Sequence, residues 1–467
     1  MLSTVHLISI IFTLLSVSMV GLYSMRRVKS AGDFAVGGRS MGVTLIVGTI
    51  VGTLVGGAST IGTAQLAFKY GFSAWWFSLG GGLACLFLGL FLAKPLREAN
   101  TSTVSGFLAQ GYNEQAGLLA SIFSSLGIFL NIIAQVLAAV ALITSVFHVS
   151  PLLAAVGTVL LIIFYVIFGG VWGTGLVGTV KIFLLYVSML AAGLTAYSLV
   201  GGISGLKDTF EPFPWFSLFG RGVSTDLAAA FSMLVGVLST QTYLQAMFSG
   251  KSAQASRKGA LLSGLVIPPI GLAGILVGSY MKAHFPEINP QEALPLFILR
   301  FLPDWLGGVV IATLLISVVG TGAGLVLGVS TMLSQDIYKK QLFPQAEDSA
   351  VLAFTRKAII GISALTLIFT TGALNSLILK WSFLSMGLRG AAVCLPLLSV
   401  VLAESYVKPR AGVLAIGLAP ISVILWSLLG PESIDPLYPG LLVSLGTLVI
   451  GSLLPLNKQS VKPGLDH

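Results

Sequence analysis

The chain has 467 residues, of which 55% are hydrophobic and only 9% are charged, with a mean hydropathy of +0.98 and a net charge of +9. About a quarter of the residues of an average soluble domain are charged, so this composition excludes a soluble globular protein and predicts a polytopic membrane protein. The positive charge lies in short loops between apolar stretches, where the positive-inside rule explains it better than nucleic-acid binding does.

Apolar stretches long enough to cross a bilayer, which takes about 20 residues, recur along the whole chain. The predicted spans are 4–24, 43–69, 73–94, 116–147, 152–170, 180–200, 225–248, 260–281, 305–334, 357–375, 377–403, 411–429 and 437–455. The first ends in arginines and has no basic residue before its apolar core, so it is predicted to be a transmembrane helix and not a cleaved signal peptide. The expected fold class is an all-α membrane protein with about 13 transmembrane helices in a single integral domain over 1–467.

The second span differs from a simple membrane anchor because glycines alternate with hydroxyl residues between Gly48 and Gly71. Each glycine weakens a helix by about 1 kcal/mol relative to alanine. A helix broken inside the membrane is tolerated where its freed backbone groups face protein or water, and secondary transporters use such breaks to hold an ion and a substrate. Close packing of small residues against another helix explains the same pattern. This stretch alone leaves both interpretations open.

Basic residues concentrate in alternate loops, and this asymmetry predicts the orientation of the chain. One set of loops holds Arg26, Arg27, Lys29, Arg39, Lys94, Arg97, Lys251, Arg257, Lys258, Lys339, Lys340, Arg356, Lys357, Lys408, Arg410, Lys458 and Lys462. The opposite loops hold Lys207, Arg221, Lys282 and Arg300. The N-terminus is therefore predicted outside and the C-terminus in the cytoplasm, in a plasma membrane such as a bacterial inner membrane. The outer loops 201–222 and 282–304 contain prolines and aromatic residues, which predict short re-entrant or interfacial helices.

Several other functions are disfavoured by what the spans contain. Every Asp and Glu falls in a loop or at the end of a span, so a proton relay through a deeply buried carboxylate is not expected. A channel would need a continuous polar pore with rings of charge, and a receptor would normally bring a cytoplasmic domain. Neither a catalytic motif nor a cluster of metal-ligating residues is present, so the chain is not expected to be an enzyme or to bind an organic cofactor. The expected partners are a small-molecule substrate and the bilayer, without nucleic acid, and the oligomeric state is left open.

Arg389 is the most unusual residue of the eleventh span. It lies nine residues after Lys380, which places it about 13 Å deeper at 1.5 Å per residue. A charge near mid-membrane is costly and usually functional, and arginine binds carboxylates in a bidentate manner. This position predicts a carboxylate-bearing substrate, while a structural arginine that caps the carbonyls of a neighbouring helix is the alternative.

Four motifs follow one another along the chain: DFAVGGRSMG at 33–42, TQTYLQAMFSGKSAQASRKG at 240–259, PQEALPLFILRFLP at 290–303 and SVVGTGAGLVLGVSTMLSQDIY at 317–338. In this order they resemble the sodium:solute symporter family, whose members have a LeuT-like inverted-repeat fold. In the second motif Ala246 follows Gln245 where family members usually have arginine. The resemblance implies two inverted five-helix repeats, 43–200 and 225–403, each beginning with a broken helix. An extra helix at 4–24 and two more at 411–455 would flank them.

The resemblance also implies a Na⁺ site between the second and ninth spans. Its ligands would be the carbonyls of Gly52, Val55 and Ser317 and the side chains at Gly320 and Thr321. Residues i, i+3 and i+4 share one helix face, so the last three can point at one ion.

Two departures from the family pattern concern this Na⁺ site. Gly320 stands where the family has a hydroxyl. An acidic residue of the family near the sixth span is replaced by Gly178, and Lys181 follows one turn later. Lys181 is either a side chain that extends to the cytoplasmic surface or a cation that occupies the Na⁺ position. The expected function is Na⁺-coupled import of a small organic solute. A proton-coupled or cation-independent carrier on the same fold is the alternative.

The substrate is expected near the two helix breaks at mid-membrane. Candidate contacts are Gly56, Gly57, Ser59 and Thr60 in the second span, Gln241, Thr242 and Gln245 in the seventh, and Arg389. Glycines let a ligand approach the backbone, and the Gln and Thr side chains supply neutral hydrogen bonds. Each of these polar residues could instead make an ordinary contact between helices.

Overall fold

The computed structural model of the chain describes residues 2–25, 37–99, 101–167, 170–374, 376–402, 407–431 and 434–453. All described elements are helices, apart from an isolated β-bridge between Met41 and Gly250. The prediction of an all-α protein is therefore confirmed. Five basic residues used to predict the orientation, Arg26, Arg27, Lys29, Lys458 and Lys462, lie outside the described residues.

The first half of the chain contains one flanking helix and the first repeat. Its elements are α1 (Thr4–Met25), η1 (Gly37–Arg39), α3 (Val43–Leu54), η2 (Ala58–Gly62), α4 (Thr63–Tyr70), η3 (Gly71–Trp75), α5 (Trp76–Phe87), η4 (Leu88–Leu92), α6 (Ala93–Glu98), α7 (Val104–Gly111), α8 (Glu114–Phe147), α9 (Pro151–Val166) and α10 (Gly170–Leu199). The broken pair α3 and α4, the run from α5 to α6, and the helices α8, α9 and α10 are the five spans of the repeat.

The second half contains the outer connections, the second repeat and two further flanking helices. Its elements are α11 (Gly202–Thr209), α12 (Pro212–Trp215), α13 (Val223–Val237), α14 (Gln241–Ser249), α15 (Ala253–His284), η5 (Pro290–Glu292), α16 (Ala293–Phe301), α17 (Asp304–Met332), η6 (Leu333–Leu342), α18 (Asp348–Thr371), α19 (Ile378–Leu402), α20 (Pro409–Leu429) and α21 (Leu437–Leu453). The short helices α11, α12 and α16 lie in the loops 201–222 and 282–304, where short helices are predicted.

Ten helices or helix runs of the described chain are long and apolar enough to cross a membrane. The shorter apolar helices α3, α9 and α21 accompany them, and the number of thirteen spans stays a prediction. Several helices extend beyond their predicted spans; for example, α10 begins at Gly170, α15 at Ala253 and α18 at Asp348. Hydropathy marks the apolar stretch of a helix, so it does not report less apolar turns that continue past that stretch.

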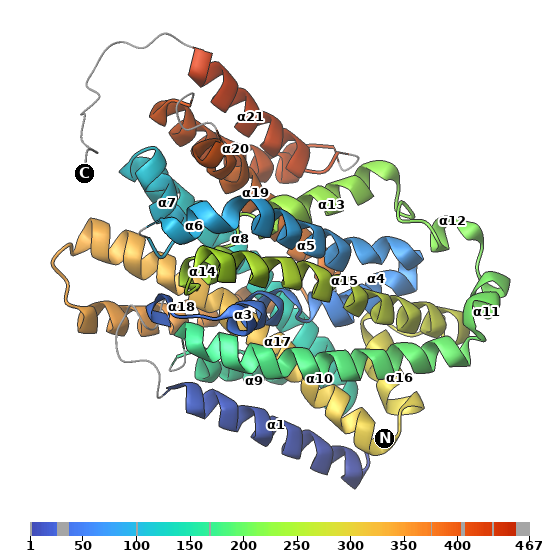
Figure 1. The fold of residues 1–467 in the computed structure, drawn as a ribbon. Coiled ribbons are helices and arrows are strands. Elements are labelled where there is room, and N and C mark those ends of the chain that lie inside the picture. The colour runs from blue at the N-terminus through green and yellow to red at the C-terminus, as the bar shows by residue number, and fades with distance from the viewer. Residues whose placement is uncertain are drawn as a thin grey trace.

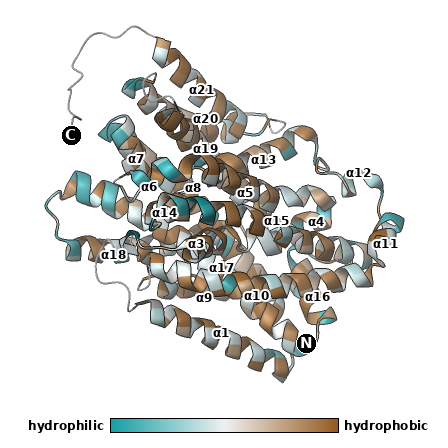
Figure 2. Cartoon of the chain, in the orientation of Figure 1, coloured by the Kyte–Doolittle hydropathy of each residue, from teal (hydrophilic) through white to brown (hydrophobic). Residues whose placement is uncertain are grey.

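The long helices run side by side, with α1 along one edge of the bundle and α20 and α21 along the opposite edge (Figure 1). In the most apolar window of the run from Asp304 to Leu342, 89% of the residues are buried, compared with 22% in that of α1. Helix α17 is thus the centre of the bundle, while α1 covers it from outside. Hydrophobic residues make up most of the ribbon, and hydrophilic turns of the buried helix α14 lie among them (Figure 2).

Candidate functional site

The first broken helix is interrupted between the end of α3 at Leu54 and the π-helix η2 that begins at Ala58. Gly56 and Gly57 form the break because no larger residue fits there. A Cβ atom at Gly56 would lie 2.5 Å from both Gln135 Oε1 and Thr321 Oγ1. A Cβ atom at Gly57 would lie 2.2 Å from another side chain. The glycine pattern therefore produces both a helix break and close packing, so the two interpretations of this stretch apply together.

The hydroxyl groups next to this break bind its freed backbone. Ser59 Oγ and Thr60 Oγ1 donate to the Gly56 carbonyl at 3.1 and 2.9 Å. Both side chains are fully buried. Ser59 and Thr60, both predicted substrate contacts, therefore lie at the break, and their hydroxyl groups already donate to the Gly56 carbonyl.

The second broken helix is interrupted between α13, which ends at Val237, and α14, which begins at Gln241. Ser239 Oγ donates to the Val235 carbonyl at 2.6 Å, and Thr240 Oγ1 donates to the Gly236 carbonyl at 2.5 Å. These bonds satisfy carbonyls at the end of α13 that have no partner within the helix. Both repeats therefore begin with a broken helix whose freed groups are bound by neighbouring hydroxyls.

The ammonium group of Lys181 lies between the first broken helix and α17. Its Nζ atom donates to the Gly52 carbonyl at 2.6 Å, to the Ser317 carbonyl at 2.7 Å and to Thr321 Oγ1 at 3.0 Å. Lys181 is only 2% exposed, so it does not extend to the cytoplasmic surface. Ser317 Oγ also donates to the Val55 carbonyl at 2.9 Å. The structure thus gathers the residues predicted as a Na⁺ site around the Lys181 ammonium.

Two pairs of glycines bring the helix of Lys181 against α3. A Cβ atom at Gly48 would lie 2.3 Å from the Gly175 carbonyl oxygen, and one at Gly178 would lie 2.1 Å from the Gly48 carbonyl oxygen. A Cβ atom at Gly52 would lie 2.8 Å from the Gly178 Cα. The backbones of α3 and α10 therefore touch, as in other small-residue helix crossings in membranes. Residues 178 and 181 share one face of α10, so this contact aims Lys181 at the end of α3.

Arg389 is fully buried at the middle of α19, next to the second helix break. Its Nε donates to Thr240 Oγ1 at 2.8 Å, and the rest of its guanidinium lies against Ser385 Oγ and Met386 Sδ. In the described part of the chain, every ion pair involves other residues. Among the described residues, Arg389 and Lys181 are thus two buried cations with no carboxylate within 4 Å. The contacts of Arg389 are to the side chains of Thr240, Ser385 and Met386.

The other predicted substrate contacts on α14 lie nearer the ends of the helices predicted to face the cytoplasm. Gln241 Oε1 accepts the Val104 backbone N–H at 2.9 Å, at the start of α7. Thr242 Oγ1 donates to the Gly324 carbonyl at 2.9 Å. Gln245 is fully buried on the same helix. Gln241 and Thr242 therefore connect α14 to the start of α7 and to α17.

A buried carboxylate makes further hydrogen bonds to the start of α7. Asp336, at the end of the long run that begins with α17, accepts hydrogen bonds from Thr103 Oγ1 at 2.9 Å and Ser105 Oγ at 2.8 Å. Its side chain is 4% exposed. Together with Gln241, it ties the start of α7, in the predicted first repeat, to the predicted second repeat.

Gln135 on α8 is a site residue that the sequence interpretation missed. Its Oε1 accepts the Gly57 N–H at 2.9 Å, and its Nε2 lies 3.4 Å from Asn131 Oδ1. Asn131 in turn accepts a bond from Ser382 Oγ of α19 at 3.1 Å. Two amides four residues apart within an otherwise apolar span are the signal that could have identified them, because they share a helix face.

Replacing Gln135 with leucine is expected to lower the thermal unfolding midpoint of the purified protein. The Gly57 N–H would lose its partner, and an unsatisfied buried donor costs about 1–3 kcal/mol. Gln135→Glu keeps an acceptor oxygen and should retain more of the stability than Gln135→Leu does. Gln110→Leu, at an exposed position of α7, is the control. Equal midpoints for Gln135→Leu and the wild-type protein would contradict the importance of this bond.

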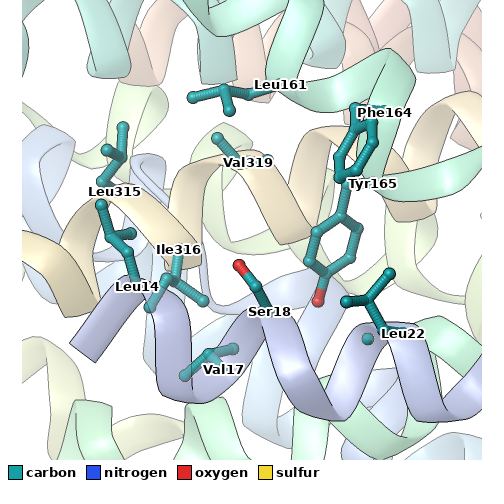
Figure 3. A pocket seen from close by; sticks show the side chains of 11 residues that line it. Leu14, Val17, Ser18, Leu22, Leu161, Phe164, Tyr165, Leu315, Ile316 and Val319 are labelled. Atoms are coloured by element: carbon teal, nitrogen blue, oxygen red, sulfur yellow. The ribbon is translucent and has the colours of Figure 1, made fainter. Parts of the chain in front are cut away.

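A separate cavity of about 200 Å³ lies between α1, α9 and α17 (Figure 3). Apolar side chains line nearly all of it, including Leu14, Phe164 and Val319. Tyr165 also lines it, and its hydroxyl is 3.7 Å from where a Cβ atom of Gly320 would be. The cavity therefore lies on the α1 side of α17, outside the helix breaks, and its surface suits lipid better than a polar solute.

Comparison with known proteins places these features in a family. The profile of the Sodium:solute symporter family matches residues 34–406. The human "High affinity choline transporter 1" is 23% identical over 385 residues, which are 74% of this chain and 64% of the human protein. The match thus spans less than two thirds of that relative. The "Sodium/glucose cotransporter" of Vibrio parahaemolyticus is 20% identical over 71% of this chain and 67% of its own.

Solved structures agree on the fold. A Na⁺-coupled sialic acid symporter, in a substrate-bound outward-open state, superposes with a TM-score of 0.80 at 18% identity and covers 97% of both chains. MhsT in complex with L-phenylalanine superposes with a TM-score of 0.58 at 16% identity, over 86% of this chain and 98% of the other. The fold with two inverted repeats and broken first helices is confirmed. The chain is an integral membrane protein, and it belongs to the sodium:solute symporter family.

Proposed function

We propose that this chain imports a small, carboxylate-bearing organic solute by alternating access between its two repeats. The observation that carries the proposal is Arg389, a buried guanidinium at the second helix break without a carboxylate partner among the described residues. An uncompensated charge in the low-dielectric interior is costly. A bidentate carboxylate is the ligand whose geometry and charge suit a guanidinium best.

The charge of the site also bears on the substrates of its relatives. Choline is a cation, and two buried cations, Lys181 and Arg389, would repel it in this chain. Two unit charges 4 Å apart interact by about 4 kcal/mol at an effective dielectric constant of 20. We therefore expect a solute of opposite charge here, although several relatives are choline transporters.

Membership in the family supports Na⁺ as the coupling ion. A second candidate, the proton-coupled or cation-independent carrier, is favoured by the Lys181 ammonium at the predicted Na⁺ position. The basic loops further support a plasma-membrane protein with its N-terminus outside, which in a bacterium means the inner membrane.

The test is the thermal stability of the purified protein with a panel of monocarboxylates, neutral amino acids, sugars and choline. A ligand that binds only the native state raises stability by RT ln(1 + [L]/Kd). A carboxylate is expected to raise the unfolding midpoint and choline is not. Uptake of that carboxylate into proteoliposomes then tests transport. Stabilisation by choline or a sugar, with no effect of any carboxylate, would refute the proposed substrate class.

A further inference from the structure

The Lys181 ammonium makes the contacts that a cation bound at this position would need. An ammonium has three N–H donors and no acceptor, and the structure supplies three acceptors within 3.0 Å: the carbonyls of Gly52 and Ser317 and the hydroxyl oxygen of Thr321. Gly52 lies in the last turn of α3, where the helix dipole favours positive charge. All three N–H donors of the ammonium therefore have an acceptor where it lies.

The same oxygens are the ligands that the family resemblance assigns to Na⁺. A bound Na⁺ in such transporters is held by unwound carbonyls and the ends of half-helices. With Lys181 in place, the Gly52 and Ser317 carbonyls and the Thr321 hydroxyl already face a positive charge. A second cation among them would be a like charge within a few ångströms of the first. The residues present, as they are arranged, do not fit a bound Na⁺.

Gly320 lacks the hydroxyl ligand that the family resemblance implies at this position. A Cβ atom there would lie 3.8 Å from Lys181 Cδ and 3.9 Å from Nζ, which is ordinary van der Waals contact. A side-chain oxygen would therefore point into the space now taken by the lysine. The chain has lost one oxygen ligand and gained one tethered cation at the same position.

We propose that the Lys181 ammonium replaces Na⁺ at this position, so that the protein closes its first broken helix against α17 without binding Na⁺ there. The inference deepens the proposed transport function and rests on it. The glycine contacts between α3 and α10 hold the ammonium in place, and its three bonds connect α10, α3 and α17. The protein would then carry a small organic solute with the Lys181 ammonium always present at the predicted Na⁺ position.

The experiment is a titration of the substrate-free, purified full chain with NaCl replacing KCl at constant ionic strength, read as the unfolding midpoint. The wild-type protein is expected to show no Na⁺-specific shift. Lys181→Ala vacates the position and should gain a saturable, Na⁺-specific rise. The double variant Lys181→Ala with Gly320→Ser restores an oxygen and should show a larger rise at lower Na⁺. Lys380→Gln, at an exposed position of α19, should behave as the wild type does.

The variant Lys181→Met distinguishes the effect of an empty cation position from the effect of a lost positive charge. The methionine side chain is neutral and fills the same space, so this variant should not respond to Na⁺. A Na⁺-specific rise in the wild-type protein as large as in Lys181→Ala would overturn the proposal. The titration needs no substrate, so it decides the question even when no carboxylate binds. Failure of the carboxylate panel would instead refute the proposed function.

Discussion

Replacing Arg389 with glutamine is expected to abolish stabilisation by the carboxylate that the wild-type protein binds. Truncating one partner of a buried, hydrogen-bonded charge pair costs about 2–5 kcal/mol. At 1.4 kcal/mol for each tenfold change, the affinity should fall by roughly 30-fold or more. The measurement is the carboxylate concentration that gives half of the maximal rise in unfolding midpoint, compared between the variant and the wild-type protein.

The substrate-free variant should nevertheless remain folded. Arg389 is a buried charge without a nearby carboxylate in the described structure, so its removal also removes a desolvation cost. Arg389→Lys keeps the charge but loses the bidentate geometry, and its affinity should lie between those of the other two proteins. Arg257→Gln, at an exposed position of α15, is the control. Unchanged affinity in Arg389→Gln would exclude the guanidinium as the carboxylate ligand.

The second large effect is expected from adding a single methyl group at Gly178. In Gly178→Ala the new Cβ would lie 2.1 Å from the Gly48 carbonyl oxygen, so α10 must move away from α3. Overpacking of this kind costs typically 1–3 kcal/mol, occasionally more. Because Lys181 lies one turn further on the same helix face, its ammonium should also be withdrawn from Gly52 and Thr321. Both the yield of folded protein and its unfolding midpoint should fall strongly.

Gly157→Ala is the matched control for this variant. Gly157 lies in α9, also within the membrane region, but a Cβ atom there would meet nothing within 4 Å. Alanine is also the better helix former by about 1 kcal/mol, so Gly157→Ala should be neutral or stabilising. If Gly178→Ala were as stable as Gly157→Ala, the close crossing of α3 and α10 would be wrong.

The first helix break had a local signal in the sequence, although only the family resemblance decided between a break and close packing, and the second break followed from the resemblance alone. Gly56 and Gly57 remove side chains where the helix must open, and Ser59 and Thr60 bind the Gly56 carbonyl from the next turn. The residues that meet around the cation position followed from a family motif, in which three positions share one face of α17. The boundaries of long helices such as α10 were predicted less accurately, because hydropathy reports the apolar stretch of a helix and not the helix length.

The direction of Lys181 could not be obtained in the same way. Whether it reached the surface or the interior depended on the distance between α3 and α10, which is set by Gly48 and Gly178, 130 residues apart in the chain. Gln135 was missed for a similar reason. Its partner, the Gly57 N–H, is 78 residues away, so the two amides of α8 indicate a polar helix face without indicating which group that face binds.

Because the Lys181 ammonium is covalently part of the protein, it affects how much charge each transport cycle moves across the membrane. A cation that belongs to the protein cannot cross the membrane with the solute, so each cycle would move only the charge of the solute itself. Entry of a monovalent carboxylate into a cell with a negative interior is opposed by about 2.3 kcal/mol for each 100 mV. Exchange of one carboxylate for another of equal charge moves no net charge and meets no such opposition. Exchange through such a carrier would follow the concentrations of the exchanged solutes on the two sides, without drawing on the membrane voltage.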